Sequence, residues 1–176
     1  MRINLFIFVF AIAGSNTVFA EEYMMNHQMH RAAMANDTRQ SVSFPPMMRE
    51  HTLSNMRDHL QALSEILVAI SEGNYAEAAK IADSRLGMAS SAAESCKAEV
   101  ITATPQMSKA PNMEQQMNQL MPQGMRSIGL EMHQAASVFA TEVSQSIKTQ
   151  EVKPALAALS RVTRQCVACH AQYKLL

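Results

Sequence analysis

Two cysteines and a histidine near the C-terminus form the most specific chemical pattern of the chain, Cys166-Val167-Ala168-Cys169-His170. Residues three apart lie on one face of a helix, so both thiols can reach the two vinyl groups at one edge of a porphyrin. His170 then holds its imidazole beneath the macrocycle, facing the iron. Cys-x-x-Cys-His is the attachment signature of a c-type haem. The motif therefore predicts one covalently bound haem c, held by Cys166 and Cys169, with His170 as an iron ligand.

Three other uses of these cysteines agree less well with the sequence. A thioredoxin-like dithiol needs a βαβ context with the pair at the start of a helix, whereas this pair ends a helical pattern. A zinc site could combine Cys96 with Cys166, Cys169 and His170, but no sequence spacing brings Cys96 near the others. A disulfide across one helical turn would be strained. Cys96 is left as a buried apolar residue or as the link of a dimer.

Two apolar stripes predict the first two helices around this motif. The first stripe lies between Pro45-Pro46 and Gly73 and consists of Leu53, Met56, Leu60, Leu63, Leu67 and Ile70. Its alternating spacings of three and four are typical of the inner face of a bundle helix. Gly73 suits the position just after a helix. Asn74 and Glu77 form a capping-box-like start for a second, alanine-rich helix over residues 75–96.

Two further stripes predict the remaining helices. The third helix follows Pro122, and its stripe consists of Met125, Ile128, Met132, Ala136, Phe139 and Val143. The fourth starts near Glu151 with Pro154 in its first turn, and its stripe consists of Leu156, Leu159, Val162, Cys166, Cys169 and Tyr173. Residues 97–121 form a long, Met-rich connection, with or without one short helix within it. The sequence predicts an all-α chain, an antiparallel four-helix bundle whose C-terminal helix attaches the haem, and no strand.

The N-terminus has the pattern of a secretory signal peptide over residues 1–20. Arg2 is followed by an apolar run over residues 5–13 and by Val18-Phe19-Ala20, which predicts cleavage before Glu21. A membrane anchor is the alternative, but the apolar run is too short to span about 30 Å of hydrocarbon. We therefore expect an exported chain in a bacterial periplasm or a similar oxidising space, with no membrane span after cleavage.

Residues 21–44 are polar and contain scattered thioether and imidazole side chains without helical periodicity. These are Met24, Met25, His27, Met29, His30 and Met34. We interpret the segment as a flexible leader that precedes a cytochrome domain over residues 45–176. Copper capture is an alternative use of the leader, because thioether and imidazole ligands suit copper.

Charge and composition exclude several classes of function. The chain carries 15 basic and 15 acidic residues and a formal net charge of zero. Without a basic stripe, a nucleic-acid partner is not expected. The sequence shows neither a Ser-His-Asp set nor a phosphate-binding loop, so we do not expect an enzyme that turns over an organic substrate.

A helical bundle with Cys-x-x-Cys-His at its C-terminal end resembles the class II c-type cytochromes, the cytochrome c′ and cytochrome c-556 family. Residues 166–174 are similar to the family pattern of motif, two residues, Tyr and a basic residue. Residues 55–60 and the turn Glu72-Gly73-Asn74 resemble the first helix of the family and the turn after it. The resemblance covers residues 45–176. It also suggests an antiparallel homodimer through the first two helices.

In that family, one residue of the first helix decides the function of the iron. An apolar residue there leaves the iron five-coordinate and able to bind nitric oxide or carbon monoxide, whereas a Met gives a six-coordinate, low-spin electron carrier. Met56 is the predicted sixth ligand, because it lies on the apolar stripe 17 residues before the predicted turn. His59 is the next candidate, and Met48 lies further round the helix. If Leu53 or Leu60 faced the iron instead, the sixth coordination position would be open.

Further residues are candidates for contact with the haem. Its propionates require cationic or hydrogen-bonding partners, which Arg49, Arg57 or Arg126 could provide. Tyr173 is expected to pack against the haem edge.

These observations predict a periplasmic one-electron carrier with His170–Met56 ligation, which exchanges electrons with redox partner proteins. The alternatives are a five-coordinate protein that binds small gases and, from a different class, a copper-handling protein that uses the Met/His leader.

Overall fold

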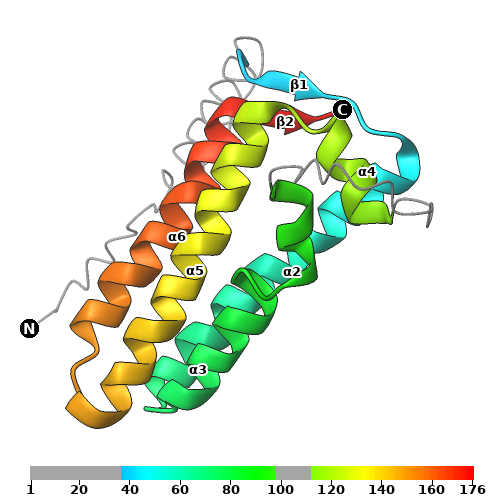
Figure 1. Cartoon of the computed structure of the whole chain (residues 1–176). Coiled ribbons are helices and arrows are strands. Elements are labelled where there is room, and N and C mark those ends of the chain that lie inside the picture. Colours follow the sequence, from blue (N-terminus) through cyan, green and yellow to red (C-terminus); the bar gives the residue numbers. More distant parts are fainter. Residues whose placement is uncertain (1–36, 98–111) are drawn as a thin grey trace, which may run out of the picture. The chain divides into compact units, whose positions relative to one another are not determined.

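The computed structural model describes residues 37–97 and 112–176, and this part of the chain is predominantly helical (Figure 1). The prediction of an all-α chain is confirmed. The chain divides into two units at residue 38, and the account below concerns the second unit, Arg39–Leu176. Within the described ranges, no helix is both long enough and apolar enough to cross a membrane.

The first long helix, α2 (Pro46–Ser71), begins and ends as its sequence predicts. Pro45 is the N-cap and Pro46 occupies the first turn, where a missing N–H does no harm. Gly73 has a φ of 72°. The Gly73 N–H donates to the Ile70 carbonyl at 3.0 Å and the Asn74 N–H to the Ala69 carbonyl at 2.8 Å. These two bonds form a Schellman motif, which requires a left-handed residue at the position of Gly73.

The apolar stripe predicted for α2 faces the interior only in part. Leu63 and Ile70 of the stripe pack against the main core but are only partly buried, whereas Leu60 is 71% exposed and Leu67 is 52% exposed. The buried apolar residues of α2 are Ala62, Ile66 and Ala69, which lie outside the predicted stripe. Both leucines line a groove that α2 shares with the last helix. α2 packs mainly against α3 and η1, so the face that it turns towards them is buried and the face that carries Leu60 and Leu67 is not.

The predicted helix over residues 75–96 is broken into three pieces. They are α3 (Tyr75–Ile81), a π-helical turn η1 (Ala82–Leu86) and a 3-10 segment η2 (Ser91–Cys96). Asn74 caps α3, because its side chain accepts the Glu77 N–H at 3.3 Å. The break falls at Gly87, where a Cβ would lie 2.8 Å from both the Asp83 carbonyl oxygen and Ser137 Oγ. Close approach to another helix therefore overrides local helix propensity there.

The predicted third and fourth helices are confirmed as α5 (Gln123–Thr149) and α6 (Lys153–Gln172), which lie side by side (Figure 1). The link between them is short and passes through Gln150, whose φ is 59°. Within the region predicted as a connection, a further helix α4 (Met113–Leu120) starts at Asn112, which forms a capping box with Gln115. Residues 98–111 of that connection lie outside the described residues.

Two three-residue strands contradict the prediction that the chain has no strand. β1 (Gln40–Val42) pairs in parallel with β2 (Tyr173–Leu175) (Figure 1). Val42 and Phe44 are 4% and 6% exposed, so the end of the segment predicted as a flexible leader is packed. The predicted flexible leader, residues 21–44, is therefore wrong at its C-terminal end, where β1 and Phe44 are packed. Residues 21–36 and the predicted signal peptide, residues 1–20, lie outside the described residues.

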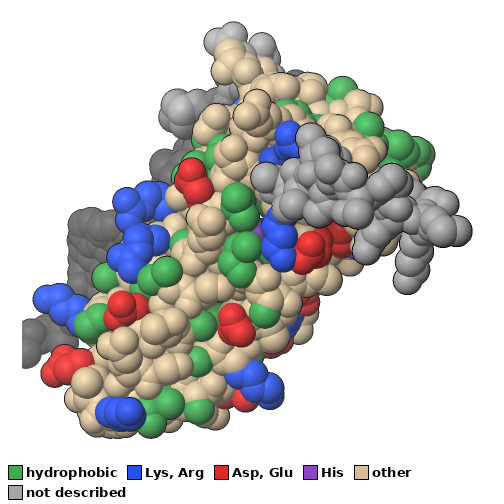
Figure 2. Space-filling model, viewed as in Figure 1, with side chains coloured by type: hydrophobic (Ala, Val, Ile, Leu, Met, Phe, Trp, Pro, Cys, Tyr) green, Lys and Arg blue, Asp and Glu red, His purple; other side chains and the backbone are tan. Residues whose placement is uncertain are grey.

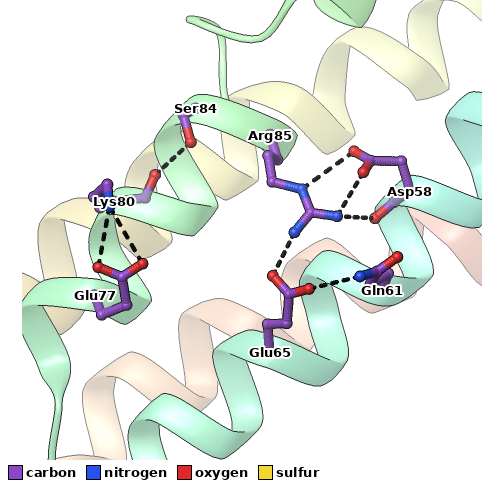
Figure 3. A network of polar contacts seen from close by, with 7 residues as sticks. All are labelled: Asp58, Gln61, Glu65, Glu77, Lys80, Ser84 and Arg85. Carbon is purple, nitrogen blue, oxygen red and sulfur yellow. Dashed lines mark hydrogen bonds and ion pairs between the residues drawn. The ribbon is translucent and has the colours of Figure 1, made fainter.

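A polar network fixes α2 against the segment that follows α3 (Figure 3). Arg85 donates from Nη2 to the Asp58 carbonyl oxygen at 3.2 Å, from Nε to the Asp58 carboxylate at 3.3 Å, and from Nη1 to Glu65. The Asp58 carboxylate and main chain hold the guanidinium in one orientation. Asp58 directly precedes His59, so the bonds from Arg85 to Asp58 also help to fix the position of His59 on α2.

Candidate cofactor site

An apolar cavity of about 430 Å³ lies among α2, η2, α4, α5 and α6. Cys166, Cys169 and His170 of the predicted attachment motif all line it. They share a cavity because α6 turns Val162 and Ala158 into the core, which brings the cysteines to the inner side of the same helix. The volume is within the range of about 300–1,000 Å³ typical of cofactor sites.

The two thiols of the motif are free and half-buried. Burial raises the pKa of Cys166 and of Cys169, and the neighbouring Cys166 thiol raises that of Cys169 further. Both side chains are therefore protonated thiols at neutral pH. A thioredoxin-like dithiol instead needs a cysteine whose pKa is lowered, so these surroundings do not favour that alternative.

Cys96 lines the same cavity, which the sequence spacing did not predict. The residue ends η2, and its sulfur lies so close to α5 that a Cβ at Gly129 would be 2.5 Å from it. Burial, Cys169 and Glu114 raise the pKa of Cys96 to about 11. In the described ranges, no three His, Cys, Asp or Glu side chains are close enough together to bind a metal ion.

Thioether side chains form much of the cavity wall. Met56 of α2 lines the cavity as predicted, whereas Met48 is not among its lining residues in the described part of the chain. Four methionines of α4, α5 and the turn between them also line it: Met117, Met121, Met125 and Met132. Met117, which is 2% exposed, has Thr52 Oγ1 3.7 Å from its sulfur. Met117, Met121 and Met125 recur every fourth residue. The first two fall in the region predicted as a connection, and Met125 lies on the stripe predicted for the third helix.

Two histidines meet at the inner end of the cavity. His59 of α2 and His133 of α5 both line it, and their rings pack edge to face, with centroids 5.8 Å apart. His133 is 2% exposed, and its Nδ1 lies 2.7 Å from the Leu86 carbonyl oxygen, so Nδ1 carries a proton. His59 Nε2 is buried and has no hydrogen-bond partner in the described structure. His133 has no distinct signal in the sequence, because it adjoins Met132 on an apolar stripe that predicts a core position.

Burial keeps both imidazoles neutral. It lowers the pKa of His59 to about 4, with a smaller contribution from His133, and it also lowers the pKa of His133. A histidine in the unfolded chain binds a proton near pH 6.5, whereas folded His59 stays neutral until about pH 4. Stability from this residue is therefore complete above pH 6.5 and is lost as the pH falls towards 4.

We expect the free energy of unfolding to fall between pH 6.5 and 4, with His59 accounting for about 3 kcal/mol of the loss. A His59→Phe variant keeps an aromatic ring but cannot be protonated, so its stability should depend less on pH over this range. Urea unfolding at several pH values measures both slopes. Equal slopes for the two proteins would show that His59 is protonated as easily in the folded chain as in the unfolded one.

One of the three arginines predicted to contact haem propionates lines the cavity. Arg57 does so, and its Nη2 lies 2.6 Å from Glu50 at the surface. Arg49 donates from Nε to the main-chain oxygen of Leu176 at 2.6 Å, and Arg126 donates to Asn118. Of these three arginines, therefore, only Arg57 is placed to contact a group in the cavity.

Tyr173 does not itself line the cavity but packs in the layer behind its lining residues. It belongs to a second apolar cluster with Val42, Phe44 and Met125, and a Cβ at Gly124 would lie 2.4 Å from its hydroxyl oxygen. Cys169 packs against the same cluster. The predicted contact between Tyr173 and the haem edge stays a prediction.

A hydrogen-bonded wall of η2 and α4 closes one side of the cavity. The Glu114 carboxylate accepts a hydrogen bond from Ser95, and one of its oxygens lies 2.6 Å from His51 Nε2 of α2. Asn118, which is 4% exposed, donates to the Ser95 carbonyl at 3.0 Å, and its own side-chain oxygen accepts from Arg126 at 2.8 Å. Buried polar groups that are all satisfied favour one arrangement, so these bonds hold Met117 and Cys96 at the wall.

The donor set fits a haem better than an isolated metal ion. Two thiols one helical turn apart and an adjacent imidazole border a cavity whose other walls are mainly apolar, which suits a porphyrin. No family model, curated protein or solved structure matches the chain. The functional argument therefore depends on the motif and on the cavity that it borders.

Proposed function

We propose that this protein is an exported c-type cytochrome that carries single electrons in the periplasm. Its helices would form an antiparallel four-helix bundle around one covalently attached haem. The observation that supports this most directly is that Cys166, Cys169 and His170 line one apolar cavity large enough for a cofactor. A one-electron redox centre is the chemistry that the haem supplies when it is bound.

In this proposal the residues of the chain attach, orient and shield the cofactor. Cys166 and Cys169 form the thioether bonds, and His170 binds the iron from the side of α6. Met56 of α2 would hold the iron through its thioether sulfur, and thioether ligation raises the reduction potential. The remaining thioethers exclude water, and their flexible side chains adapt to the macrocycle. Arg57 contacts a propionate at the edge of the cavity.

Gas binding is the second candidate function. Leu53 and Leu60 of α2 line the cavity beside Met56. If one of them faced the iron instead of the Met56 sulfur, the sixth position would be open to nitric oxide or carbon monoxide. The two functions differ in the spin state of the iron, which an absorption spectrum reports.

Mass and absorption spectra of the protein from cells that mature c-type cytochromes test the proposal. The intact mass should equal the chain from Glu21 onwards plus one haem. A sharp α-band in the reduced state and a weak far-red sulfur-to-iron band in the oxidised state should show low-spin ligation with Met. A bare polypeptide mass would refute the cytochrome, and a high-spin spectrum would favour gas binding.

A further inference from the structure

The charge of α6 differs from that of the other helices. From Lys153 to Leu176 the chain contains four basic residues, Lys153, Arg161, Arg164 and Lys174, and no Asp or Glu. The chain as a whole has a formal net charge of zero. The helix that carries the attachment motif is therefore locally cationic on an otherwise balanced protein.

Four cations outside α6 have a carboxylate partner. Arg57 pairs with Glu50, Lys80 with Glu77, Arg85 with Asp58 and Glu65, and Lys97 with Glu94. No ion pair is recorded for Lys153, Arg161 or Arg164 anywhere in the described ranges. The neighbouring α5 carries Glu131 and Glu142, and neither forms an ion pair with α6 in that same part of the structure. The positive charge of α6 is therefore not neutralised locally.

These three cations lie together on the outer face of α6. At 100° per residue, Lys153, Arg161 and Arg164 fall within about 80° of one another, and Arg164 is about 160° round the helix from Cys166. All three are exposed, as is Val167, at 67%, between the two cysteines. Figure 2 shows Lys and Arg side chains along the side of the molecule that α6 forms in Figure 1.

This face is also the short route to the cofactor site. Cys166 and Cys169 belong to α6 and line the cavity. A molecule on the outer face of α6 is therefore separated from the cavity by the width of that one helix. A helix with its side chains is about 10–12 Å across. A thioether bond at Cys166 or Cys169 would join a haem directly to this helix, so a partner on the outer face would not require the cavity to open.

We propose that the outer face of α6 is the docking surface for a negatively charged redox protein. The inference rests on the proposed function, since it assumes a haem attached to α6. One electron passes between the cofactor of that protein and the haem, so one centre is oxidised as the other is reduced. Opposite charges raise the rate of encounter and orient the two proteins.

An anionic membrane surface is a poorer fit to the same cations. A helix that lies in a membrane interface carries large apolar side chains that enter the lipid. Beside its cations, the outer face of α6 presents the small residues Ala157, Ser160 and Ala171 and two larger apolar side chains, Leu156 at 43% exposed and Val167 at 67%. Such a surface can approach a flat, charged protein patch but offers little apolar area to insert.

Salt-dependent electron-transfer rates test the docking surface on the haem-loaded protein. Reduced protein is mixed with an acidic blue-copper protein, and the second-order rate is measured at several ionic strengths. The wild-type rate should fall as salt screens the attraction. The double variant Arg161→Glu, Arg164→Glu should react about tenfold more slowly at low salt and converge with the wild type at high salt. With a basic blue-copper protein, the same variant should react faster than the wild type.

Lys80→Glu is the matched control, because it reverses a charge on α3 rather than α6, and its rates should stay within about twofold of the wild type. Calorimetric binding of the acidic protein should weaken only in the double variant. Equal effects of both charge reversals, or none, would overturn the proposal. The proposal would also be overturned if the wild type bound phosphatidylglycerol vesicles and the double variant did not, while the two had equal electron-transfer rates with the acidic protein. An unaltered haem spectrum in every variant separates these results from a failure of the cytochrome assignment.

Discussion

Replacement of Cys166 and Cys169 by alanine should give an exported protein without covalent haem. Both thioether bonds are lost, and His170 alone cannot retain the cofactor through a denaturing step. The intact mass should fall to that of the polypeptide, and the haem stain of a denaturing gel should disappear. This is the largest effect that we expect from any substitution in the cavity.

Cys96→Ala is the matched control, because Cys96 lines the same cavity and is also half-buried. It should keep one haem per chain. If Cys96→Ala lost the haem while the double variant kept it, the attachment motif would be assigned to the wrong cysteines. Retention of covalent haem by all variants would refute thioether attachment altogether.

Met56→Leu should convert a low-spin haem into a high-spin haem that binds carbon monoxide readily. Leucine has a similar volume but no sulfur, so the expected packing cost is below about 1.5 kcal/mol. The reduction potential should fall, because thioether ligation favours the reduced iron. Absorption spectra with and without carbon monoxide, together with a redox titration, measure these changes.

Met121→Leu removes a different thioether from the wall of the cavity and should leave the low-spin spectrum unchanged. Met56→Ala is a poorer test, because a cavity in a typical core costs about 2–5 kcal/mol and could change the spectrum through unfolding. If Met56→Leu stays low-spin, Met56 only packs, and His59 becomes the ligand to examine. A wild type that is already high-spin would favour gas binding.

Several features of the chain are determined by residues close together in sequence. The helices α2, α5 and α6 occur where the three- and four-residue spacings of apolar side chains predict them. The end of α2 follows from Gly73, which reaches its φ of 72° without a Cβ penalty. The Cys-x-x-Cys-His spacing likewise places two thiols one turn apart on any helix. These features were predictable because their hydrogen bonds and side-chain contacts span at most five residues.

The tertiary structure decided which distant residues complete the site. It brought Cys96 and His133 to the cavity, broke the helix predicted over residues 75–96 at Gly87, and paired β1 with β2. The contacts of Cys96 and His133 and the pairing of β1 with β2 join segments that are dozens of residues apart, and so does the close approach of Gly87 to Ser137 of α5. Their formation depends on close approach of backbones and on burial shared by several helices, which periodicity along one segment does not encode. Sequence therefore predicted which residues attach a haem, and packing determined which side chains form the cavity around them.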